Sequence, residues 1–218
     1  MELWTMWIEF IHVLIIGLSG NVGFGLGIAI IATTILFRLL LLPISWPIGY
    51  RACIRQKKLR KLQPQLQRLR EAYSAKPELY MQQMKSLYKR HNLKLFDGLG
   101  LLGGLLQIPV FLGMFHVLKG FGEGIRFLWV TNLAKPDFWF AIIAGITTAL
   151  MMMVNPDMPE HLRIAMIVIP CILTIIFALN FSSALAIFWS TSNCFTALQT
   201  AALHFLIRHR MKLGTLKF

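Results

Sequence analysis

A single arginine stands in the middle of a long apolar stretch. Arg38 lies within residues 28–47, IAIIATTILFRLLLLPISWP, and the next cation along the chain is Arg51. Because thirteen helical residues span roughly 20 Å, the Arg38 side chain cannot easily reach water at that end. A guanidinium so deep in a membrane costs at least ~2.5 kcal/mol unless water, polar groups or thinned lipid surround it. Arg38 is therefore either an arginine that snorkels without a task or the charged wall of a polar cavity.

Two other apolar stretches carry polar side chains at a comparable depth. The first holds Gln107, within residues 98–119. The second, residues 183–207, has a polar face at helical spacing, made of Trp189, Ser192, Asn193 and Thr196. Small hydroxyl groups often only join neighbouring membrane helices, and that interpretation stays open here. We expect Arg38, Gln107 and this polar face to line one hydrophilic groove within the membrane.

Hydrolytic chemistry has one weak candidate. Residues 17–20, GLSG, match the GxSG of intramembrane serine proteases, which need that serine opposite a histidine of another span. Here Ser19 ends the first predicted helix, and neither His116 nor His204 has an evident reason to meet it. The sequence has no phosphate-binding loop, no HExxH and no cysteine metal cluster. We therefore expect no catalytic residue, no metal and no cofactor.

The composition is that of a membrane protein with several spans. The 218 residues are 56% hydrophobic, with a mean hydropathy of +0.64, which is too apolar for a soluble domain of this length. Lys and Arg number 22 against 9 acidic residues, and cationic loops remain in the cytoplasm. Cys53, Cys171 and Cys194 are scattered and imply no disulfide framework.

The distribution of apolar stretches and cations predicts a topology. We expect five spans at residues 21–49, 98–119, 138–154, 164–180 and 183–207. We expect an outer loop at 120–137, an inner loop at 155–163 and a cationic cytoplasmic tail at 208–218. Since the cations concentrate on the predicted inner side, the N-terminus is expected outside and the C-terminus inside. The predicted fold is an all-α polytopic membrane protein.

Residues 1–20 predict an amphipathic helix. Its polar side chains recur at spacings of three and four and form one face: Glu2, Thr5, Glu9 and His12. The rest of the helix is apolar and carries Trp4 and Trp7. Such a helix suits the outer membrane interface, and a poor transmembrane span is the alternative.

Residues 50–97 predict a basic helical hairpin. Between Arg51 and Lys94 there are thirteen cations and two acids. The apolar residues repeat at spacings of three and four on both sides of a turn near Pro77: Leu59, Leu62, Leu66, Leu69 and Tyr73, then Tyr80, Met84, Leu87 and His91. These seams predict an antiparallel coiled coil in the cytoplasm, with its first arm interrupted at Pro64. The charge is either a solvated face or a docking surface for anionic lipid or ribosomal RNA.

The arrangement resembles that of the YidC/Oxa/Alb membrane protein insertases. The matching segments, in family order, are TTILFRLLLLPIS, QPQLQRLREAY, MKSLYKRHN, LLQIPVFLGMF, FLWVTNLAKPD and ALAIFWSTSNCFTALQ. Together the segments cover nearly the whole chain and are specific to the family. No single segment is specific by itself. One departure concerns the last motif, where NFSSALAIFW lacks the proline or glycine that usually precedes it.

The resemblance implies five spans around a positively charged groove that is open to the cytoplasm and the lipid and closed towards the outside. It implies that Arg38 attracts polar or acidic parts of nascent membrane proteins, with Gln107 and Trp189 at matching groove positions. It also implies docking of clients, the ribosome or the Sec translocon by the hairpin and the inner loop. The docking cations we single out are Arg55, Lys57, Lys58, Arg60, Lys61 and Arg163.

We expect a monomeric insertase core in a bacterial inner membrane, with an organellar inner membrane as the alternative. The chief rival function is a small solute or anion transporter or channel that uses Arg38 as its substrate site. The basic hairpin favours the insertase, because a pore has no need of it.

Overall fold

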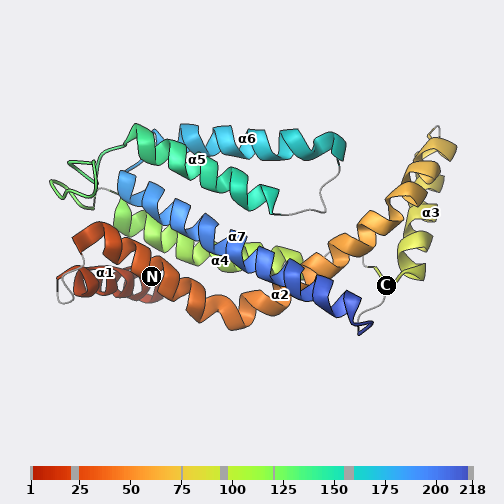
Figure 1. Ribbon diagram of the computed structural model, residues 1–218, viewed down its shortest axis with the longest axis horizontal. Helices are drawn as coiled ribbons and strands as arrows, with labels where there is room; N and C mark the ends of the chain where they lie inside the picture. Colours follow the sequence, from red (N-terminus) through yellow and green to blue (C-terminus); the bar gives the residue numbers. More distant parts are fainter. Residues whose placement is uncertain are drawn as a thin grey trace. The chain divides into compact units, whose positions relative to one another are not determined.

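The computed structural model describes residues 2–20, 25–74, 76–93, 98–119, 121–154 and 160–215. Within them the chain is helical (Figure 1), apart from turns and one isolated bridge between Phe127 and Val130. The helices are α1 Glu2–Gly20, α2 Gly25–Ala72, α3 Pro77–Arg90, α4 Gly98–Leu118, α5 Phe138–Met153, α6 Glu160–Ala178 and α7 Ser183–Lys212. The predicted all-helical class is confirmed for the described residues.

Several helix boundaries differ from the prediction. Helix α2 runs without interruption from the first apolar stretch into the basic arm, so residues 49 and 50 do not separate two helices. The interruption expected at Pro64 is also wrong, because α2 stays helical there. A proline removes a single backbone donor, and the turns on either side can hold the helix together. Helix α6 begins at Glu160, before the predicted 164, and α7 continues through the predicted cationic tail to Lys212.

In the part of the chain that the structure describes, two helices are long and apolar enough to cross a membrane by length and hydropathy, namely α1 and α2. Shorter apolar helical stretches are Gln107–Leu118, Phe138–Met153 and Arg163–Ala178. The number of spans and their orientation therefore stay predictions. Of the predicted inner loop, residues 155–159 lie outside the described residues, as do Lys94 and Lys217.

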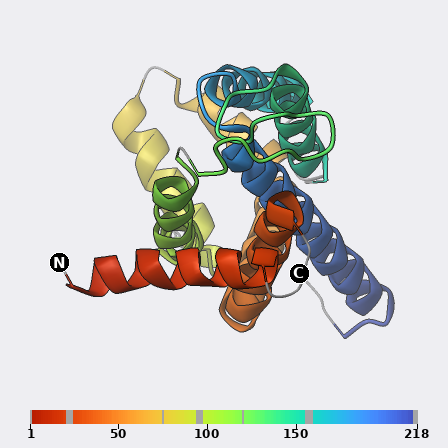
Figure 2. The same ribbon diagram turned by 90° about the vertical axis from the view of Figure 1, so that its left-hand side faces the viewer.

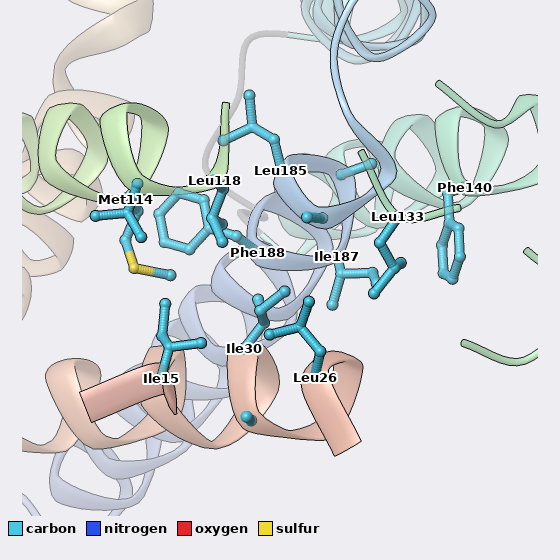
Figure 3. Packing of buried hydrophobic residues seen from close by; sticks show 14 of the residues in the cluster. Ile15, Leu26, Ile30, Met114, Leu118, Leu133, Phe140, Leu185, Ile187 and Phe188 are labelled. Carbon is cyan, nitrogen blue, oxygen red and sulfur yellow. The ribbon is translucent and has the colours of Figure 1, made fainter. Parts of the chain in front are cut away.

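The chain forms two compact units. The first consists of Met1–Ile44 and Leu106–Ala202. Its core joins α1, α2, α4, α5, α7 and the loop between α4 and α5 (Figure 3). The core residues labelled there are Ile15, Leu26, Ile30, Met114, Leu118, Leu133, Phe140, Leu185, Ile187 and Phe188. We call the end of this unit that carries residues 119–137 the loop end.

Helix α1 lies across the other helices of the first unit (Figure 2). The indole Nε1 of Trp7 donates to the carbonyl oxygen of Pro109 at 3.1 Å, and Ile11 and Ile15 are fully buried. A Cβ atom on Gly113 would lie 2.5 Å from Trp7 Nε1, so α1 approaches the backbone of α4 where only glycine fits. A second face of α1 is apolar and exposed, through Leu3, Met6, Phe10 and Val13.

The turn between α6 and α7 is tied to the loop end by hydrogen bonds. The Ser182 hydroxyl donates to the Leu118 carbonyl oxygen at 2.9 Å, and the Ser183 hydroxyl donates to the Lys135 carbonyl oxygen at 2.6 Å. The backbone amide of Ala184 donates to Leu133 at 3.1 Å. Ser182 and Ser183 therefore anchor the start of α7.

The second unit consists of Ser45–Leu105 and Leu203–Phe218 and contains the hairpin. After a turn at residues 73–76, α3 returns antiparallel to the end of α2 (Figure 1). The predicted seam positions are buried or half-buried, except for the exposed His91. Separately, Cys53 packs with Leu203 and Ile207 in a small buried cluster.

Candidate functional site

Arg38 of α2 is held by one residue of α7. Its Nε donates to the Ser192 hydroxyl oxygen at 3.1 Å, and its Nη2 donates to the same oxygen. Ser192 is only 5% exposed, whereas the Arg38 side chain is half-buried. The five apolar stretches 28–47, 98–119, 138–154, 164–180 and 183–207 contain no acidic residue. Among the described residues, no carboxylate pairs with Arg38, and its other N–H groups have no acceptor.

Aromatic side chains pack against one another on the loop-end side of Arg38. Phe37 precedes it, is 4% exposed and has its ring centroid 5.4 Å from that of Trp7. On the facing helices, the Phe111 ring lies 5.4 Å from Trp189 and 6.3 Å from Phe188. These rings form two aromatic clusters, one between α1 and α2 and one between α4 and α7.

On the other side of Arg38, α2 and α7 are less buried within the protein. On α2, many positions between 26 and 37 are buried, whereas none is buried between Arg38 and Ala52. On α7, residues 182–188 are all buried, whereas most of residues 191–202 are half-buried or exposed. Both helices therefore change from mostly buried to mostly half-buried or exposed near the hydrogen bond between Arg38 and Ser192. The Arg38 guanidinium lies where the buried parts of α2 and α7 meet their less buried parts.

Two predicted groove residues lie in a second polar cluster, centred on Thr148 of α5. Asn193 Nδ2 donates to the Thr148 hydroxyl oxygen at 2.8 Å, and Trp189 Nε1 donates to the same oxygen at 3.3 Å. The Thr174 hydroxyl of α6 lies 3.2 Å from it. This Thr148 cluster joins α5, α6 and α7 by hydrogen bonds. Contacts of this kind join neighbouring helices, whatever further role Trp189 and Asn193 have.

Arg38 contacts Ser192, whereas Trp189 and Asn193 share the Thr148 hydroxyl as their acceptor. Among the described residues, no hydrogen bond joins the first pair to the second. Gln107 is half-buried in α4, and no hydrogen bond among the described residues links it to Arg38. The Thr196 hydroxyl donates to the Ser192 carbonyl oxygen at 2.9 Å, one turn back on its own helix.

Sequence reasoning missed Thr148 and Thr174. Each is a polar residue in an apolar helical stretch, where threonine is common. Composition therefore did not indicate that their hydroxyl groups form hydrogen bonds between helices. The only signal was the pair Thr147-Thr148 within an otherwise apolar stretch. Ser19 of the GLSG motif lies in the last turn of α1, and no hydrogen bond joins it to His116 or His204 among the described residues.

The predicted docking cations lie on two elements. Arg55, Lys57 and Lys58 are half-buried in α2, and Arg60 and Lys61 are exposed one turn further along it. Arg163 is exposed in the first turns of α6. Arg55, Lys58, Arg60 and Lys61 also interact with other parts of the chain, so their charge is not wholly free for a partner.

The chain is similar to known bacterial proteins over most of its length. A family model described as 60Kd inner membrane protein matches residues 17–211. Membrane protein insertase YidC of Clostridium tetani is 31% identical over 200 residues, which cover 87% of this chain and 86% of the relative. YidC 1 of Halalkalibacterium halodurans is 35% identical over 187 residues, covering 80% and 68%.

Other relatives are much longer than this chain. Membrane protein insertase YidC of Cellvibrio japonicus is 33% identical over 211 residues, which cover 90% of this chain but 35% of the relative. The chain thus spans most of some relatives and about a third of others. The extent of these matches confirms the resemblance inferred from the motifs. The chain belongs to the 60Kd inner membrane protein family, which includes the YidC insertases.

Proposed function

We propose that this protein inserts transmembrane segments of other proteins into the lipid bilayer from a groove that contains Arg38. The observation that carries the proposal is a half-buried guanidinium, held by one serine and paired with no carboxylate among the described residues. The relatives with matching segments are named membrane protein insertases. Those names favour the insertase over the solute transporter or channel.

The groove lowers the cost of moving a polar segment through lipid. Hydrocarbon offers no hydrogen-bond partner, so each uncompensated polar group costs several kcal/mol there. The polar side chains that follow Ser192 on α7, among them Thr196, provide a polar route that reaches Arg38. A client's polar flank therefore has a shorter apolar distance left to cross.

Arg38 is a transient partner for acidic flanks. A charge in a low-dielectric site attracts an opposite charge much more strongly than it does in water. Because only Ser192 occupies the guanidinium, its other donors can meet a client carboxylate without first breaking an internal ion pair. A neutral hydroxyl partner also holds the arginine less firmly than an aspartate would, which favours release.

Release into lipid supplies the driving force. Burying each CH₂ group of the client's apolar segment contributes ~0.8 kcal/mol, so about twenty apolar residues offset a large polar cost. Helices α2, α5 and α6 carry many exposed apolar side chains, among them Leu40, Leu150 and Leu173, and these faces suit contact with lipid. No hydrolysed nucleotide or bound cofactor is needed for this step.

The protein acts in a bacterial inner membrane, with the loop end outside and the basic hairpin in the cytoplasm. The excess of cations in the hairpin and the end of α7 supports this orientation. The hairpin and Arg163 receive clients as they emerge from a ribosome or a Sec translocon. The groove residues are Arg38, Gln107, Trp189, Ser192, Asn193 and Thr196, with Trp189 and Asn193 acting by fixing α7 against α5.

Reconstitution of the purified protein into liposomes tests the proposal. A radiolabelled client with one span and an acidic flank is added, and its protection from protease is measured. We expect protection with wild-type protein and a loss of at least tenfold with Arg38→Ala. Arg126→Ala, an exposed arginine of the loop end, is the matched control and should retain protection. Protection equal to that of empty liposomes, together with solute flux, would favour the transporter.

A further inference from the structure

The polar face of α1 opens onto a cavity that the insertion mechanism does not use. The cavity is wide open at the protein surface, has a volume of about 570 Å³ and lies between α1 and the loop end of α4. Its polar and aromatic lining is formed by Thr5, Glu9, His12, His116, Lys119 and Phe121. This volume is in the range of pockets that hold small organic ligands.

The charges in this cavity are of both signs and are held apart. Glu9 comes from α1, whereas His116 and Lys119 come from the end of α4. Neither the Glu9 carboxylate nor the Lys119 ammonium forms an ion pair with any residue that the structure describes. The His12 ring is exposed and makes an edge contact with Phe121, at 5.3 Å between the centroids. The cavity therefore offers a cationic side and an anionic side at the same time.

The face of α1 beside this cavity is apolar and exposed. At 100° per residue, helix α1 divides into three sectors. Trp7, Ile11 and Ile15 pack against the core, Thr5, Glu9 and His12 line the cavity, and Leu3, Met6, Phe10 and Val13 are exposed. Of these, Leu3 is 84% exposed and Met6 is 64% exposed. A ligand in the cavity can therefore extend apolar chains along α1.

We infer that this cavity binds the headgroup of a phospholipid with a primary ammonium group, as in phosphatidylethanolamine. Lys119 and the imidazole N–H groups of His12 and His116 donate to the phosphate, and Glu9 accepts from the ammonium. The acyl chains lie along the exposed apolar sector of α1. The lipid would fix α1 in the membrane interface, which adds a binding site to the proposed insertase and does not depend on insertion.

Lipid binding to the purified, delipidated full-length protein in detergent tests this inference. Three lipids with identical acyl chains are titrated and read out by native mass spectrometry: phosphatidylethanolamine, phosphatidylglycerol and phosphatidylcholine. We expect the ethanolamine lipid to bind several-fold more tightly than the other two. The glycerol headgroup offers Glu9 only neutral hydroxyl donors, and the choline headgroup has no N–H donor for it.

Two variants assign the ends of the headgroup. Glu9→Gln should remove the preference, so that the three lipids bind with equal affinity. Lys119→Gln should weaken all three about tenfold, the size expected for losing one charge-assisted hydrogen bond. Lys135→Gln is the matched control, because Lys135 is an exposed cation of the same loop end and does not line the cavity. It should bind all three lipids as the wild type does.

Three results would overturn the inference. Equal binding of the ethanolamine and glycerol lipids to the wild type would mean that the phosphate alone is recognised. A preference that survives Glu9→Gln would place the ammonium elsewhere. Competition by soluble glycerophosphoethanolamine at the same concentration as the lipid would mean that α1 holds no acyl chains and that the ligand is not a lipid.

Discussion

The Ser192 hydroxyl of α7 accepts hydrogen bonds from both Nε and Nη2 of Arg38 on α2, although the two residues are 154 positions apart in the chain. One small side chain thus orients the only cation of the apolar stretch 28–47, at the level where the buried part of α7 ends. A neutral partner leaves the positive charge uncompensated. The positive charge of Arg38 is therefore available to a client that enters along the less buried part of α7.

Ser192→Ala separates the role of the charge from the role of its orientation. We expect insertion of an acidic client to fall severalfold, and by less than with Arg38→Ala, because the charge remains but loses its anchor. Ser192→Thr keeps the hydroxyl and should restore most of the activity. The measurement is protease protection in liposomes at matched protein density. A Ser192→Ala variant as inactive as Arg38→Ala would mean that the charge alone is insufficient.

Replacement of Arg38 itself distinguishes charge from shape. We expect Arg38→Lys to retain most of the insertion activity, since a client carboxylate needs a positive charge and no fixed fork. Arg38→Glu should be the most damaging change, because it repels acidic flanks and places a new charge beside buried Ser192. A series of clients with zero, one and two acidic residues in the flank makes the comparison. An Arg38→Lys variant that fails on every client would show that the planar guanidinium is required.

Much of this arrangement could be predicted from the sequence. The apolar stretches, the hairpin seams and Arg38 follow from hydropathy and from spacings of three and four. The partners of the polar face could not be predicted. Ser192 and Asn193 are neighbours about 100° apart on one helix, so they point to different helices, α2 and α5. Periodicity identifies a face of a helix, but it does not identify what that face meets.

The continuity of α2 also lay beyond the sequence signals. Residues 43–50, PISWPIGY, contain two prolines and a glycine, which favour a break between the span and the hairpin. The helix continues because each proline removes a single donor, and flanking residues such as Trp46 and Tyr50 pack against the cluster of Cys53, Leu203 and Ile207. Tertiary packing therefore overrides local propensity at this point.

Thr148→Val tests the Thr148 cluster. The change keeps the shape but leaves Asn193 and Trp189 without their shared acceptor, so we expect the free energy of unfolding to fall by about 1–2 kcal/mol. Thr147→Val is a matched control, since that buried hydroxyl donates only to the Ala144 carbonyl oxygen of its own helix, at 3.0 Å. Thermal unfolding in detergent compares the two variants. Equal losses would mean that the hydrogen bonds between helices contribute nothing beyond burial.

Gly113→Ala tests the close approach of α1 to α4. The added Cβ would lie 2.5 Å from Trp7 Nε1 and 2.6 Å from the Ile11 side chain, so α1 must shift or detach. We expect a lower unfolding temperature and a red shift in tryptophan fluorescence as Trp7 becomes exposed. Gly17→Ala is the control, because a Cβ there meets nothing within 4 Å and alanine favours the helix. Matching behaviour of the two variants would contradict the tight packing of α1.

The salt dependence of ribosome binding tests the docking role of the hairpin. We expect neutralisation of Lys57, Lys58 and Lys61 together, each to Gln, to weaken binding of the full-length protein to purified ribosomes. Each lysine that contacts a phosphate contributes about 0.7–0.9 to the slope of log affinity against log salt, so three contacts would lower the slope by about 2. Circular dichroism checks that α2 stays helical, since Lys58 and Lys61 also interact within the chain. Lys135→Gln, at the opposite predicted side of the membrane, should leave the slope unchanged. An unchanged slope in the triple variant would instead assign these cations to topology alone.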